Sequence, residues 1–194
     1  MTPEEIESSI ARALRGDQTG YAALYEVFAP GIYRLCYSLL FNREDAEDVA
    51  QEAFVYAFRN LHRYDRKLSS LKTWLYTIAI CRCRNMYRKN QLPTCDLAPL
   101  LQIGLPAPRS ETPEAALARQ TARETVERAL ASLSPRLREA VVLRYGHGLT
   151  YREIADVMDC PQKTAESRVR LAHEALRGSL QPVGHGLLEE LLSF

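Results

Sequence analysis

The sequence lacks any apolar run near the ~20 residues that a membrane-spanning helix requires. Its N-terminal residues are acidic and do not follow the basic and then apolar order of a signal peptide. The five cysteines are odd in number and scattered, a pattern more typical of inert reduced thiols than of a disulfide framework or a redox sensor. These absences predict a cytoplasmic protein without direct membrane insertion.

Signatures of catalysis are also missing. The sequence has no nucleophile–base motif, phosphate-binding loop or nucleotide fingerprint, and its four histidines are dispersed. Glu44, Asp48 and Glu52 share a helix face, but metal sites built only from oxygen ligands on an exposed helix face are unusual. We therefore expect no enzyme, no metal and no other cofactor. A metal- or redox-dependent helical enzyme stays open as the third-ranked alternative.

No stretch alternates with strand period, so the sequence predicts an all-α fold. Thr2, Asp17, Ser69 or Ser70, and Thr150 are placed to cap helices, and Pro30 predicts a kink or a restart within the second helix. The expected helices cover about 3–15, 17–42, 44–60, 70–89, 113–131, 135–145, 150–158 and 161–177.

Half of the ten prolines lie between residues 90 and 113, which interrupts the helical pattern. Such a stretch is too long for an ordinary loop inside a compact domain, and it indicates a linker. The prediction is therefore two small helical domains, 1–89 and 113–178, joined by the proline-rich linker 90–112. The tail 179–194 ends in a short amphipathic segment that either folds back on its own domain or docks on a partner.

Charge is separated locally although the chain has a formal net charge of only +1. Residues 59–89 hold nine basic side chains and one acid, whereas residues 44–52 hold five acids. A cationic surface with aromatic side chains suits a nucleic-acid strand, and Tyr64 is the better candidate for base stacking because Trp74 is expected in the core. The acidic surface suits a protein with a basic face.

Residues 150–177 have the layout of a helix-turn-helix, although an ordinary helical hairpin is the alternative. The second helix begins at Pro161 and would present its N-terminal residues to a major groove. Residues 151–177 balance five bases with five acids, so this module alone is expected to bind duplex DNA weakly.

Three stretches, 45–54, 73–79 and 133–155, together resemble an extracytoplasmic-function sigma factor of bacterial RNA polymerase. The stretches resemble, in order, the acidic helix of region 2, the start of the promoter-reading helix, and region 4. The resemblance implies a region 2-like domain before the linker and a region 4-like helix-turn-helix domain after it. It also implies a promoter-specificity subunit that binds core polymerase and promoter DNA, with an anti-sigma factor as its inhibitor.

The resemblance assigns three groups of residues. The polymerase clamp coiled coil would be bound by Asp45, Asp48, Gln51 and Glu52. The −10 element would be captured and melted with the help of Arg63, Tyr64, Arg66, Lys67, Cys81, Arg84, Asn85, Arg88 and Lys89. The −35 element would be read by Gln162, Lys163, Glu166, Ser167, Arg168 and Arg170, on a domain that also contacts the polymerase flap.

Three positions depart from the family's usual residues. Glu166 stands where a basic residue is usual, Lys163 where glycine is frequent, and Cys81 where a polar residue is common. These departures bear on the promoter sequence and not on the class of function. The second-ranked alternative is a stand-alone helix-turn-helix regulator, which would leave the acidic and basic helices unexplained.

Overall fold

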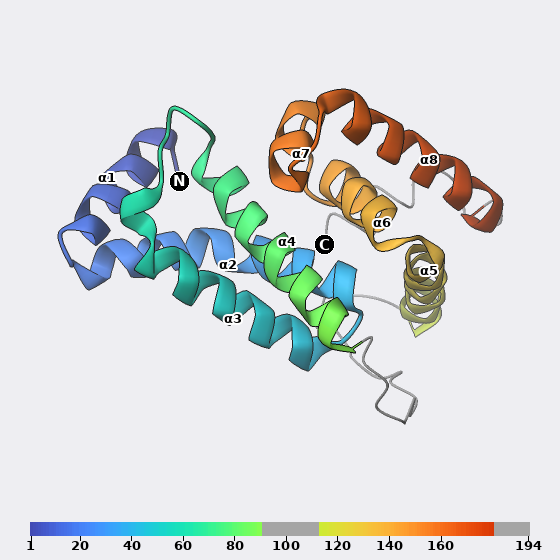
Figure 1. Ribbon diagram of the computed structural model, residues 1–194. Helices are drawn as coiled ribbons and strands as arrows, with labels where there is room; N and C mark the ends of the chain where they lie inside the picture. Colours follow the sequence, from blue (N-terminus) through green and yellow to red (C-terminus); the bar gives the residue numbers. More distant parts are fainter. Residues whose placement is uncertain (91–112, 181–194) are drawn as a thin grey trace.

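The structure is a computed structural model that describes residues 1–90 and 113–180 (Figure 1). Within these ranges the chain is helical, as the sequence predicted. The predicted linker 90–112 and tail 179–194 lie outside the described part except at their first residues, because residue 90 ends α4 and residues 179–180 end α8. The N-terminal bundle consists of α1 (Pro3–Leu14), α2 (Gln18–Leu40), α3 (Arg43–Arg59), the short 3₁₀ turn η1 (Leu61–Arg63) and α4 (Leu71–Asn90). The C-terminal bundle consists of α5 (Pro113–Ser132), α6 (Pro135–Val141), the π-helical turn η2 (Val142–Gly146), α7 (Tyr151–Met158) and α8 (Gln162–Leu180).

Side-chain caps fix where several helices begin. Thr2 and Thr150 each form a complete capping box with the glutamate three residues later. Asp17 accepts a hydrogen bond from the backbone N–H of Thr19 at 2.9 Å, and the hydroxyl of Ser70 accepts one from the N–H of Thr73 at 3.1 Å. These caps confirm the helix starts that the sequence predicted.

Two helices differ from the prediction. Of the kink or restart predicted at Pro30, the restart does not occur: the second helix continues from Gln18 to Leu40, with buried Leu24 before the proline and buried Ile32 after it. Burial on both sides of the proline favours a continuous helix, because packing supplies most of the stability of helices in proteins. The predicted helix 135–145 is regular only to Val141 and then widens into the π-helical turn.

Helices α1 and α2 approach each other closely at Gly20. A Cβ at this position would lie 2.6 Å from the backbone nitrogen of Ala13 and 2.7 Å from the carbonyl oxygen of Ser9. Only glycine leaves room for this crossing without a backbone shift. The crossing holds α1 against the layer formed by α2, α3 and α4 (Figure 1).

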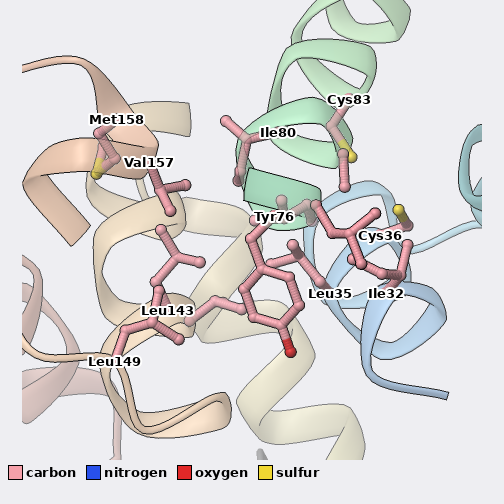
Figure 2. Close-up of a cluster of buried hydrophobic side chains, with 14 of the residues drawn as sticks. Ile32, Leu35, Cys36, Tyr76, Ile80, Cys83, Leu143, Leu149, Val157 and Met158 are labelled. Atoms are coloured by element: carbon pink, nitrogen blue, oxygen red, sulfur yellow. The ribbon is translucent and has the colours of Figure 1, made fainter. Parts of the chain in front are cut away.

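The two bundles pack directly against each other. Helix α4 contacts α7, and α2 contacts both η2 and α6, so buried residues of the two bundles form one continuous hydrophobic cluster. Figure 2 shows the Tyr76 side chain between Ile32 and Leu35 of α2 on one side and Leu143 and Leu149 of the C-terminal bundle on the other. The sequence predicted two domains and a linker but gave no indication of this contact.

Candidate nucleic-acid and polymerase interface

The acidic face of α3 is presented to solvent. Asp48, Gln51 and Glu52 are exposed and Asp45 is half-buried, while Ala46, Val49, Ala50 and Ala53 on the other face are buried. The face arises from the three- and four-residue spacing of the helix. It places all four predicted polymerase-binding residues on one side of the N-terminal bundle.

Two apolar side chains extend the acidic face. Val55 and Tyr56 are 50% and 41% exposed. They follow Glu52 by three and four residues and therefore continue the same helix surface. Sequence reasoning missed them, although this spacing would have been the signal to find them.

The basic loop between α3 and α4 has exposed charges and an ordered aromatic pair. Arg63, Arg66 and Lys67 are exposed, and Arg66 makes a solvent-exposed ion pair with Glu7 at 2.8 Å. Such a surface pair is weak and easily exchanged for a phosphate. The cationic groups of the loop are thus accessible from solvent.

Tyr64 is half-buried in this loop. Its ring centroid lies 5.5 Å from that of Trp74, and its hydroxyl donates a hydrogen bond to the carbonyl oxygen of Ser69 at 3.1 Å. Burial raises the pKa of Tyr64 above its ordinary value. The tyrosine therefore orders the loop, and one side of its ring already packs on Trp74, which is partly buried and packs against the hydrophobic core.

The C-terminal half of α4 carries the remaining −10 candidates. Cys81, Asn85 and Arg88 are exposed, and the guanidinium of Arg88 donates to the side-chain oxygen of Asn85. Nearby, the guanidinium of Arg82 lies 4.8 Å from the ring centre of Tyr56, so it joins the basic helix to the acidic one. The side chain of Lys89 lies outside the described part.

Arg84 differs from its neighbours because it faces the C-terminal bundle. Its Nε and Nη2 donate to Oε1 and Oε2 of Glu139 at 3.0 and 2.8 Å. The side chain of Glu139 is only 1% exposed and that of Arg84 is 19% exposed. Burial is the largest influence and opposes the charge of Arg84, but the hydrogen bonding and negative charge of Glu139 outweigh it, so the pKa of Arg84 is raised.

The helix-turn-helix forms as predicted. Asp159 adopts a left-handed backbone conformation (φ 51°) that reverses the chain between α7 and α8. Ala165, Val169, Ala172 and Leu176 form the buried stripe of α8. The second helix therefore turns its remaining residues outward, as a recognition helix requires.

The predicted −35 residues differ in exposure. Gln162, Lys163 and Arg170 are exposed, whereas Glu166, Ser167 and Arg168 are half-buried. Gln162 donates a hydrogen bond to the carboxylate of Glu166 at 2.9 Å, so this carboxylate already has a partner within the helix. Nη1 of Arg168 is buried without a hydrogen-bond partner among the described residues, so this part of the guanidinium is turned away from solvent.

A groove of about 580 Å³ lies where α4 begins and the turn between α7 and α8 ends. Its walls come from residues 68–77 of the N-terminal bundle and 155–161 of the C-terminal bundle. No cluster of potential metal ligands occurs in residues 1–90 and 113–180. The same ranges contain no helix long and apolar enough to cross a membrane.

Comparison with known families identifies both bundles. Residues 24–92 match the family model of sigma-70 region 2, and residues 123–176 match that of sigma-70 region 4. The chain is 34% identical over 189 residues to the RNA polymerase sigma-H factor of Pseudomonas aeruginosa, covering 94% of this chain and 97% of that protein. The chain belongs to the extracytoplasmic-function sigma factors.

Further relatives agree with this assignment. The ECF sigma factor SigW of Bacillus subtilis is 30% identical, and the match covers 91% of this chain and 97% of that protein. The ECF sigma-E factor of Escherichia coli K12 is 33% identical, and the match covers 90% of this chain and 93% of that protein. The sigma factor directs RNA polymerase to promoters and is not an enzyme. The stand-alone regulator is thereby excluded, because the match to region 2 accounts for the N-terminal bundle.

Solved structures show the same fold. CnrH, solved with the cytosolic domain of CnrY, superposes with a TM-score of 0.69 at 22% identity, covering 93% of this chain and 99% of that one. RpoE of Bartonella quintana, solved with the anti-sigma factor NepR, superposes with a TM-score of 0.67 at 22% identity, covering 84% and 98%.

Proposed function

We propose that the two oppositely charged helices of the N-terminal bundle divide the work of this sigma factor. The acidic face of α3 binds the clamp coiled coil of core polymerase through Asp45, Asp48, Gln51 and Glu52. The basic loop and α4 bind the −10 element. The observation that carries the proposal is the direct packing of α3 against α4, which fixes an acidic and a basic surface on one small body.

At the −10 element, cations and amides have separate tasks. The exposed Arg63, Arg66, Lys67 and Arg88 neutralise phosphates, which positions the strand without reading it. Asn85 and Cys81 lie on the exposed side of α4, where they meet base edges. A base leaving the stack needs an apolar partner, and the loop ordered by Tyr64 supplies one.

At the −35 element, α8 enters the major groove. Its exposed residues Gln162, Lys163 and Arg170 are free to approach DNA, and Ser167 lies between them on the helix. Because basic and acidic residues balance in this domain, its affinity for DNA is low in isolation. Tethering both domains to one polymerase converts two weak contacts into a strong composite preference.

An anti-sigma factor is the proposed inhibitor, and the cytoplasm is the proposed compartment. Support for the inhibitor comes from the likeness of this fold to RpoE of Bartonella quintana, which was solved with the anti-sigma factor NepR. Support for the compartment comes from family membership, because transcription takes place where the chromosome lies.

The experiment that tests the division of work is assembly of the holoenzyme with Asp48→Lys. Reversing one charge at the centre of the acidic face is expected to lower affinity for core polymerase at least tenfold while helix content by circular dichroism stays unchanged. Glu26→Lys on the exposed surface of α2 makes the same charge change outside the face and serves as the control. Unchanged assembly of the Asp48 variant would remove the clamp assignment.

A further inference from the structure

The C-terminal bundle covers part of the surface that is proposed to bind the −10 element. Helix α7 packs along α4, and side chains from both bundles meet in one buried cluster (Figure 2). Polar contacts surround this cluster. The hydroxyl of Tyr37 on α2 donates to Oε1 of Glu127 on α5 at 3.2 Å, and three further sets of contacts reach the end of α2 and both halves of α4. Each contact joins a side chain of one bundle to a group of the other.

The first contact is the ion pair between Arg84 and Glu139. Both oxygens of the Glu139 carboxylate accept hydrogen bonds from Arg84, and Arg136 adds a longer contact of 3.5 Å to Oε2. A planar carboxylate held by two parallel N–H groups has the geometry with which arginine also binds a phosphate. Glu139 thus occupies the position that a DNA phosphate would need at Arg84.

The second contact brings Arg138 against the end of α2. Its Nη1 donates to the carbonyl oxygen of Leu39 at 2.9 Å, and its guanidinium lies 4.9 Å from the ring centre of Phe41. The same carbonyl accepts a hydrogen bond from Tyr87 of α4. Arg138 and Glu139 are neighbours in sequence, so one turn of α6 reaches both α2 and α4.

The third contact is made by His147, in the loop before α7. Its carbonyl oxygen accepts a hydrogen bond from Nζ of Lys72 at 2.9 Å, and its Nδ1 lies 3.1 Å from the hydroxyl of Tyr76. Lys72 and Tyr76 lie one turn apart on α4. This contact therefore covers the first half of α4, whereas Glu139 covers the second half at Arg84.

We propose that this docked arrangement is a self-inhibited state of the sigma factor, in which Glu139 stands in for a phosphate and occludes Arg84. The inference rests on the proposed role of α4 at the −10 element. Binding of polymerase and promoter must separate the bundles, because a duplex or a strand cannot reach Arg84 while α6 and α7 cover it. The ion pair is suited to such a switch, since its two charges are exchangeable for a phosphate and for solvent.

The test uses the full chain without polymerase. Glu139→Gln keeps the shape of the side chain but removes its charge, and it leaves Arg84 without its counter-ion. The radius of gyration measured by small-angle X-ray scattering is expected to rise. The Kd for a single-stranded oligonucleotide carrying the −10 element is expected to fall about tenfold, because the fraction of chains with separated bundles grows about tenfold. Glu124→Gln, an acid of the same bundle paired with Gln120 inside α5, is the control.

His147→Ala provides a second variant, because it removes the Tyr76 contact from a loop and not from a buried helix. The same two changes are expected of it, with helix content by circular dichroism unchanged. A wild-type chain that already scatters as two separated bundles would overturn the proposal. So would folded variants that open without binding the oligonucleotide more tightly, or variants that stay closed. Transcription by the wild-type holoenzyme, measured in parallel, tests the proposed function separately.

Discussion

The hydroxyl of Tyr76 on α4 meets Nδ1 of His147 in the C-terminal bundle at 3.1 Å, with the two rings edge to face at 5.1 Å. Burial, and then the positive charges of Arg34 and Lys72, lower the pKa of His147 from 6.5 to about 3. Burial raises the pKa of Tyr76 to about 12, so the tyrosine stays protonated near neutral pH. The docked state therefore holds a neutral histidine between two bundles.

This relationship predicts that docking weakens in acid. When the bundles separate, His147 regains an ordinary pKa and takes up a proton below pH 6.5, which the docked state cannot do. The contribution of His147 to the free energy of docking is therefore fully present above pH 6.5 and is lost as the pH falls toward 3. At pH 5 the loss is about 2 kcal/mol. The expected observation is a radius of gyration that rises between pH 6.5 and pH 5.

Other charged groups also surround His147. Lys72 and Arg34 are cations, and Glu153 lies within electrostatic reach of Lys72. Burial opposes ionisation of Glu153, but hydrogen bonds from Thr150 outweigh it and lower its pKa, so it stays ionised. His147→Gln should abolish the pH dependence; a variant that opens in acid as the wild type does would assign the effect elsewhere.

A second prediction concerns Arg88, an exposed cation of α4 that is not part of the docking contacts. Arg88→Ala is expected to lower transcription from every target promoter several-fold, because a phosphate contact carries no sequence information. Run-off transcription on a panel of promoters measures this, with Arg43→Ala on α3 as a control outside the basic surface. A loss confined to promoters with one −35 sequence would contradict the assignment.

A third prediction concerns Arg170 on the exposed side of α8, where it pairs with Glu174 at 2.7 Å. Arg170→Ala is expected to change the preference among −35 variants while the preference among −10 variants stays the same. Competition between promoter templates for one holoenzyme measures both preferences at once. An unaltered ranking of −35 variants would count against α8 as the reader of this element.

A fourth prediction concerns the crossing of α1 and α2. Gly20→Ala adds a Cβ that meets backbone atoms of Ala13 and Ser9, so it should lower the free energy of unfolding by about 1–3 kcal/mol. Alanine is otherwise the better helix residue by about 1 kcal/mol, so stabilisation would show that the crossing relaxes easily. Chemical denaturation gives the value, with Gln18→Ala at the exposed start of α2 as the control.

Much of the local structure follows from sequence patterns. Thr2 and Thr150 begin helices because a threonine followed three residues later by glutamate satisfies the free N–H groups of the first turn. The buried stripe from Ala165 to Leu176 follows from its helical spacing. The acidic and basic surfaces could be located for the same reason, since side chains three or four residues apart share a face.

The docking of the two bundles could not be predicted in this way. Arg84 and Glu139 lie 55 positions apart, and no periodicity or turn signal connects them. A single arginine and a single glutamate in polar stretches of helix are ordinarily solvent-exposed. Only the tertiary arrangement shows that Glu139 is buried and that one member of the basic set is already neutralised within the chain.

In the proposed division of work, the acidic face of α3 and the basic surface beside it together place polymerase at promoters. The decisive measurement is run-off transcription by core polymerase with and without this chain, with start sites mapped on templates that vary in the −10 and −35 elements. We expect defined start sites that depend on the chain and are lost with Asp48→Lys. Starts that are equally frequent and at the same positions without the chain would contradict it.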